Sequence, residues 1–272
     1  ANKEVGVTSS DSTFVGAWSG SAALQWNHIG SGNSNFSASL AGAAAANNIQ
    51  SKTNAVVKNS SIQNANKFKV NALSGGTQVA AGAGLEAAKE SGGQGKSYLL
   101  GTSASINLVD NEVSAKSENN IVEGESENKK MNVDVTAYEA DTQVTGALDL
   151  QAGKSSGTAG AAITVAKLNN KVNASISGGK YTKVNRADAK ALLATTQVTA
   201  AVATGGTISS GAGLGNYQGV VSVNKIDNDV EAGIDKSSIE GADEVNVIAK
   251  DVKGSSNLAK EYQALLNGKD EK

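Results

Sequence analysis

Apolar and polar residues alternate in four short runs that recur about every 60 residues along the chain. The apolar positions are Phe68, Val70 and Ala72; Met131, Val133, Val135 and Ala137; Ala189, Ala191 and Leu193; and Val245, Val247 and Ala249. Lysine, asparagine and aspartate stand between them, which is the pattern of a β-strand with one buried face. Because no long run has the helical period of 3.6 residues, the pattern predicts strands rather than helices.

Two further phrases recur in the same order and give the chain an internal repeat. One phrase reads AAITVAKLNNKVNASI at 161–176, and its other copies stand at 43–50, 106–115 and 223–234. The other phrase is Thr-Gln-Val, at 77–79, 142–144 and 196–198, with a weaker copy at 12–15. Two unrelated marks in the same order indicate a repeat protein of about four units.

The asparagine phrase also predicts a corner. Ile163 and Val165 share one parity of the alternation, whereas Leu168 and Val172 share the other, so we expect the chain to turn between them. Asparagine tolerates the left-handed backbone of a tight corner. We therefore expect four register asparagines to be structural corner residues. They are Asn48, Asn111, Asn170 and Asn228.

These patterns predict an all-β fold, a parallel β-solenoid over residues 1–254. A propeller is disfavoured because the units lack the usual aromatic residue of each blade. With strands of roughly five residues, each unit of roughly 60 residues would form three coils, and about 13 coils would make a rod roughly 60 Å long. Trp18 and Trp26 are expected to plug one end of this stack. Residues 255–272 form a tail with a predicted short C-terminal helix, capped by Ser255 and Ser256 and followed by Gly268.

Composition narrows the class further. The chain of 272 residues has no proline and no cysteine, and its formal net charge is −2. Missing proline suits long backbone ladders, and missing cysteine excludes disulfides and thiol catalysis. The mixed charge argues against a nucleic-acid partner. The chain begins at Ala1 without an initiator methionine or a signal peptide, so we expect a fragment of a longer protein.

The candidate chemical motifs are weak. His28 is the only histidine, and Arg186 the only arginine. The stretch 92–97 reads GGQGKS but lacks the first glycine of a phosphate-binding loop, and the acidic loop 118–127 is followed closely by Lys129 and Lys130. We predict no catalytic residue, no metal site and no cofactor. The alternative is a glycan-cleaving site built from Asp141, Asp149 or Asp188 and their neighbours.

Two phrases carry a family resemblance. Residues 161–178, AAITVAKLNNKVNASISG, and 220–235, VVSVNKIDNDVEAGID, resemble the repeats of large bacterial exoproteins of the type V, two-partner secretion route. The nearest resemblance is to leukotoxin-like and filamentous-haemagglutinin-like passengers. It covers about residues 40–250 and supplies no catalytic motif.

The resemblance implies a right-handed parallel β-helix that is secreted or displayed on the bacterial surface. The expected function is that of a non-enzymatic passenger fragment of a toxin or adhesin, a virulence factor that serves as a scaffold for host-cell contact. Its expected partners are a host-cell surface protein or glycan and the outer-membrane transporter of the parent protein. We expect the fragment itself to be a monomer. The alternatives are a polysaccharide lyase or glycosidase on the same scaffold, or an inert spacer.

Overall fold

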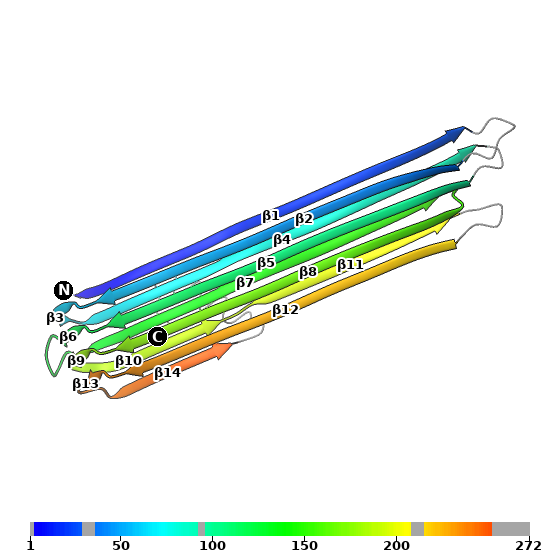
Figure 1. Ribbon diagram of the computed structural model, residues 1–272. Helices are drawn as coiled ribbons and strands as arrows, with labels where there is room; N and C mark the ends of the chain where they lie inside the picture. The colour runs from blue at the N-terminus through cyan, green and yellow to red at the C-terminus, as the bar shows by residue number, and fades with distance from the viewer. Residues whose placement is uncertain (1–2, 29–35, 92–95, 208–214, 252–272) are drawn as a thin grey trace.

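All regular elements of the described residues are β-strands, as Figure 1 shows. The structure is a computed structural model, which describes residues 3–28, 36–91, 96–207 and 215–251. The predicted tail and its helix at 255–272, together with residues 252–254, lie outside the described residues. No helix long and apolar enough to cross a membrane occurs within the described ranges.

The strands form three sheets in which every neighbouring pair is parallel. Sheet A contains β1 (Glu4–His28), β4 (Lys67–Ser91), β7 (Met131–Gly153), β10 (Val184–Leu193) and β14 (Glu244–Asp251), with β11 (Thr196–Thr207) also paired to β7. Sheet B contains β2 (Phe36–Lys58), β5 (Lys96–Glu118), β8 (Gly157–Ser177) and β12 (Gly215–Asp235). Sheet C contains β3 (Ser61–Ala65), β6 (Ile121–Gly124), β9 (Lys180–Thr182) and β13 (Ser238–Ile239).

The chain visits sheets A, B and C in rotation, and one circuit takes the whole repeat of about 60 residues. The expected three short coils per repeat are therefore wrong. The strands of sheet B are 21 to 23 residues long, far above the average of roughly five. In Figure 1 the long strands run side by side along the molecule, and sheet C lies at one end of them.

The parity switch in the asparagine phrase is not a corner. In β8 the side chains of Ala162, Thr164 and Ala166 are buried, and so is Leu168 of the same parity. Ile163 lies on the opposite face, with 38% of its surface exposed. The strand therefore keeps one inward face throughout, and what changes is the size and polarity of the residues on that face.

The interior has two halves. In the half next to sheet C, which we call the apolar half, the two long sheets enclose large buried side chains such as Phe68, Met131, Val135 and Val172. The alternating runs supply this core, so the predicted inward faces of the first three runs are confirmed. In the half farther from sheet C, the polar half, most inward positions hold small or polar residues, and the buried apolar exceptions are Leu99, Val109 and Leu168.

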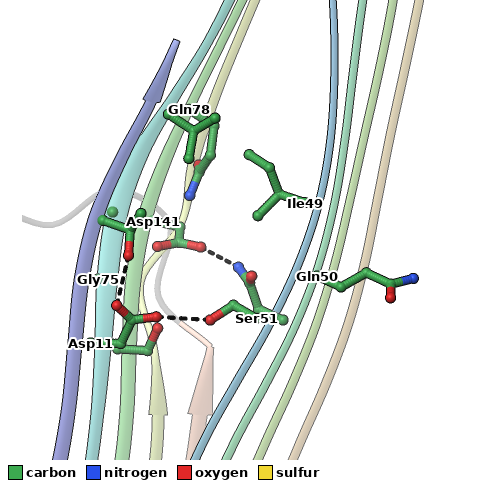
Figure 2. A pocket seen from close by; sticks show the side chains of 12 residues that line it. Asp11, Ile49, Gln50, Ser51, Gly75, Gln78 and Asp141 are labelled. Carbon is green, nitrogen blue, oxygen red and sulfur yellow. Dashed lines mark hydrogen bonds between the residues drawn. The ribbon is translucent and has the colours of Figure 1, made fainter.

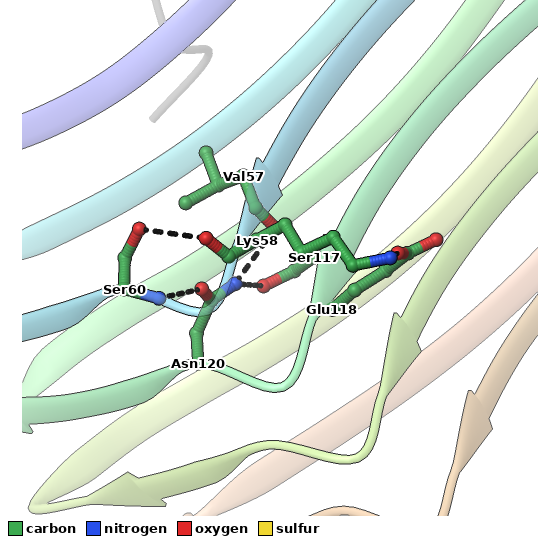
Figure 3. A network of polar contacts seen from close by, with 6 residues as sticks. All are labelled: Val57, Lys58, Ser60, Ser117, Glu118 and Asn120. Atoms are coloured by element: carbon green, nitrogen blue, oxygen red, sulfur yellow. Dashed lines mark hydrogen bonds and ion pairs between the residues drawn. The ribbon is translucent and has the colours of Figure 1, made fainter.

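The corner from sheet B to sheet C uses a left-handed residue in every circuit. Asn59, Asn119, Gly178 and Lys236 all have positive φ angles, of 52°, 52°, 63° and 48°. Figure 3 shows how Asn120 braces this corner. Its Oδ1 accepts a 2.8 Å bond from the backbone N–H of Ser60, and its Nδ2 donates to the carbonyl of Val57 at 2.9 Å. Asparagine thus occupies two of these four corners, but neither Asn59 nor Asn119 is an asparagine that the sequence indicated.

Trp18 does not plug the end of the stack. Its side chain points outward from β1 and is 64% exposed. The side chain of Trp26 lies outside the described residues.

Candidate functional site

A row of polar side chains crosses the interior where the apolar half meets the polar half. We call this row the polar seam. It contains Asp11, Ser51, Asn111, Glu139, Asp141, Asn170, Asn228 and Asp251. Sheet B supplies the serine and the asparagines, whereas sheet A supplies the acids.

The asparagines of the seam form a ladder from one circuit to the next. Asn111 Nδ2 donates to Asn170 Oδ1 at 3.3 Å, and Asn170 Nδ2 donates to Asn228 Oδ1 at 3.1 Å. Asn228 Nδ2 then donates to the carboxylate of Asp251 in sheet A at 2.9 Å. In the first circuit Ser51 takes the same register position and donates to Asp11 at 3.0 Å. The ladder therefore joins sheet A at both ends of the stack.

Two acids in the middle of the seam share the amide of one asparagine. Glu139 and Asp141 stand two residues apart on the inward face of β7, and both are almost fully buried. Asn111 Nδ2 donates to Glu139 Oε1 at 2.7 Å and also to Asp141 Oδ2. One amide thus partly compensates two carboxyl groups that have lost their water.

Burial raises the pKa of both acids. For Glu139 the loss of water raises the pKa well above its usual value, and the nearby charge of Asp141 raises it further. For Asp141 burial again raises the pKa, while hydrogen bonds from Glu139, Asn111 and Gln78 oppose the shift. Because both carboxyl groups are buried close together, burial favours the neutral form of each, and the two acids titrate as a coupled pair.

A glutamine ladder follows the seam into the polar half. Gln78, Gln143 and Gln197, the central residues of the three Thr-Gln-Val copies, pair in register in β4, β7 and β11. Gln143 Nε2 crosses to sheet B and donates to the carbonyls of Asn107 and Lys167, at 2.8 and 3.1 Å. The predicted register of these three copies is confirmed, and Gln143 fastens one sheet to the other.

Two more acids lie deeper in the polar half. Glu86 of β4 accepts a 2.6 Å bond from the backbone N–H of Ala41, and burial raises the pKa of Glu86 to about 7. Burial also raises the pKa of Asp149. A side chain at Gly101 or Gly160, opposite in sheet B, would collide with the Asp149 carboxylate. Glycine is needed there because the sheets approach each other closely.

A hollow of about 140 Å³ opens beside the seam in the first circuits, as Figure 2 shows. Its polar lining includes Asp11, Ser51, Gln78, Asn111 and Asp141. The hollow is large enough for a few water molecules, each of which takes up about 30 Å³ in the liquid. No cluster of three or more potential metal ligands of the His, Cys, Asp or Glu type exists in the described part of the chain.

The structure brings three of the four predicted asparagines together. Asn111, Asn170 and Asn228 share one register column, but they lie within β5, β8 and β12 and point inward rather than forming corners. Asn48 stands elsewhere, because it pairs with Leu108 and points outward. In the first circuit Ser51, not Asn48, occupies the register position of the ladder asparagines.

The other sequence motifs, namely His28, residues 92–97, the acidic loop and Arg186, do not form a catalytic or binding site within the described residues. The side chain of His28 and residues 92–95 lie outside the described residues. In the acidic loop, Glu118 pairs with Lys58 at 2.9 Å and Glu123 pairs with Lys183 at 2.8 Å. Arg186 and Lys190 both pair with the buried Asp188, at 3.0 and 2.9 Å. These charges are used in ion pairs between neighbouring strands or along one strand.

Three acids of the interior, Asp11, Glu86 and Glu139, were missed by sequence reasoning. A usable signal was present for Glu139 alone, because the inward parity that begins at Met131 continues through it to Gln143. Glu86 shares the parity of Phe68, Val70 and Ala72 but lies well beyond that run, and only Val5 and Val7 precede Asp11 in its parity.

No family model, no curated protein and no solved structure matches this chain. Its function therefore has to be inferred from the geometry and from the repeated phrases of the sequence.

Proposed function

We propose that this chain is a right-handed β-solenoid segment of a secreted or surface-displayed bacterial toxin or adhesin. In this proposal it is non-enzymatic and acts as a scaffold for host-cell contact. The rotation of the chain through three parallel sheets supports the solenoid. The type V passenger resemblance of 161–178 and 220–235 supports the secreted class.

The non-enzymatic proposal rests on one observation: the polar groups of the seam bond to one another. The amides of Asn111, Asn170 and Asn228 bond to one another and to acids of the opposite sheet. Glu139 is fully buried, so a polymeric substrate cannot reach it without separating the sheets. Such buried, mutually bonded polar groups support a role in aligning the circuits.

The outer surface supports a contact role. Strands of up to 25 residues give flat faces roughly 80 Å long at about 3.3 Å per residue. A host-cell surface protein or glycan is the proposed ligand, and the outer-membrane transporter of the parent protein is the proposed export partner. Both follow from the resemblance.

Binding to cells tests this proposal. Fluorescently labelled protein is incubated with host leukocytes and epithelial cells, and attachment and lysis are scored by flow cytometry. We expect saturable attachment that an excess of unlabelled protein displaces. Heat-unfolded protein is the control for adhesion that does not need the fold. Attachment to neither cell type, with no turnover of glycans, would support the inert spacer instead.

A glycan-active enzyme is the second candidate, and the acids beside the hollow favour it. Asp141 lines the hollow and has a raised pKa, as a general acid requires. The test is release of sugar fragments from complex polysaccharides by the native chain and by Asp141→Asn. Product release that Asp141→Asn abolishes would establish this candidate and overturn the non-enzymatic proposal.

A further inference from the structure

The outer side of sheet A carries no charge along residues 14–24 of β1 and the residues of β4, β7 and β11 that lie in register with them. We call this surface the outer apolar face. It consists of every second residue from 14 to 24 in β1, 77 to 87 in β4, 142 to 152 in β7 and 196 to 206 in β11. Threonine is the only polar residue type among these positions. The face is thus a continuous uncharged surface across four strands.

Several large side chains of this face are open to solvent. Phe14 and Trp18 are 62% and 64% exposed, and their rings stack with centroids 6.1 Å apart. Leu85, Val198 and Val202 are each about half exposed. Monomeric soluble proteins rarely expose contiguous apolar patches of more than a few hundred Å². A surface of this kind indicates a binding partner.

The interior explains why the apolar residues stand outside. Inward positions in this half hold the glutamine ladder, Glu86 and Asp149. A Cβ added at Gly82 would lie 2.7 Å from the backbone oxygen of Ala104 in the opposite sheet. At Gly82 the two sheets are therefore too close for a side chain. The exposed apolar residues of sheet A point away from this interior, so only a partner on the outer side can bury them.

The size of the face matches a protein interface. Four strands spaced by about 4.8 Å are roughly 19 Å wide, and 11 residues of strand are roughly 36 Å long. The face thus covers roughly 700 Å². Two such faces together would bury roughly 1,400 Å², which is within the usual range for stable protein complexes, about 1,200 to 2,000 Å².

The sheet edges favour a second copy over a lipid surface. Among the strands that the structure describes, β1 pairs only with β4 and β11 only with β7. The outer edges of these two strands present backbone N–H and C=O groups that water can satisfy and hydrocarbon cannot. Packing of one sheet on another covers the apolar face and leaves both edges in water. An uncharged face is also complementary to itself.

We propose that two copies of this chain pack their outer apolar faces together as aligned sheets about 10 Å apart, related by a two-fold axis. This differs from the monomer expected from the sequence, because the register gathers onto one surface residues that are far apart along the chain. The proposal goes beyond the proposed host-cell role and does not depend on it.

Sedimentation velocity of the full chain over a wide concentration range tests the proposal. We expect a reversible dimer. Leu85→Lys and Val198→Lys place a charge on the face at exposed positions, and each is expected to weaken dimerisation by about 100-fold or more, since a charge buried without a partner is costly. Ile163→Lys, at an exposed position on the outer side of sheet B, is the matched control and should leave the dimer intact.

Three results would overturn the proposal. The first is a native chain that stays monomeric at every concentration, whether or not it floats with phosphatidylcholine vesicles. The second is a dimer that Ile163→Lys disrupts and Leu85→Lys does not. The third is a dimer that neither face variant weakens. Circular dichroism checks that each variant keeps its strands, and Val198→Lys, in the shorter strand β11, serves if Leu85→Lys does not fold.

Discussion

The two halves of the interior hold the same two sheets together in different ways. Next to sheet C, large side chains such as Phe68 and Met131 pack between the sheets. Farther along the same strands, the amides of Gln143 and Asn107 bond to backbone carbonyls of the opposite sheet. One fold can therefore combine an apolar core with a hydrogen-bonded interior along a single strand.

The energetics of the two halves differ. Burial of a large apolar side chain stabilises a fold by about 1.5 to 3 kcal/mol, whereas a hydrogen bond contributes a net of about 0.5 to 1.5 kcal/mol. The polar half also contains acids whose burial is unfavourable when they are charged, namely Glu86 and Asp149. We infer that most of the stability lies in the apolar half and that the polar half opens first.

Truncation of the largest apolar side chain in the core, that of Phe68, tests this difference most strongly. Phe68→Ala should lower the free energy of unfolding by about 3 to 5 kcal/mol, because it leaves a cavity among fully buried neighbours. The measurement is urea unfolding followed by circular dichroism. Phe14→Ala, the same change at a largely exposed position of sheet A, should cost no more than about 0.5 kcal/mol if measured where the chain is monomeric. Equal losses would contradict the division into halves.

Loss of the shared amide in the seam should have an intermediate effect. Asn111→Ala removes the donor to Glu139 and Asp141 and is expected to cost about 2 to 3 kcal/mol near neutral pH. The loss should shrink in acid, where both carboxyl groups are protonated. Asn173→Ala removes an exposed amide of β8 that bonds to Glu231, and it should change stability by less than about 0.5 kcal/mol. A seam variant as stable as this control would show that the ladder is not needed.

The acid of the polar half should give the smallest effect and a pH dependence. The pKa of Glu86 is raised from 4.5 to about 7, so the folded chain holds this proton more tightly than the unfolded chain. Its contribution is fully present below the unfolded pKa and is lost as the pH rises through about 7. The raised pKa values of Glu139, Asp141 and Asp149 act in the same direction.

Glu86→Gln isolates this contribution. Glutamine can still accept the bond from Ala41, but it carries no charge, so the variant should gain about 1 to 2 kcal/mol at about pH 8 and almost nothing at about pH 4. The measurement is the melting temperature across this pH range. Glu231→Gln, a change on the outer face of sheet B, is the control. A pH profile that Glu86→Gln leaves unchanged would assign the dependence to the other buried acids.

The site was only partly predictable. The Thr-Gln-Val copies were correctly aligned because their spacing equals one circuit, and Asn111, Asn170 and Asn228 stack for the same reason. Asn48 was misplaced because a different number of residues separates the first copy from the second. Glu139 was missed because an acid is not expected in a core, and only the partner strand shows that Asn111 reaches it.

By itself the sequence determined the strands, the repeat of about 60 residues and the inward face of the alternating runs, since these are properties of neighbouring residues and of period. Only the tertiary structure decided that one repeat is one circuit with long strands. Where the interior holds small and polar residues, the large apolar residues of a strand fall on its outer face instead of its inner face. In the sequence, this change of parity looks the same as a corner. Sheet spacing and cross-strand register settle which it is. The spacing depends on bonds such as those between residues 24 to 45 positions apart, and the register on residues about 60 positions apart.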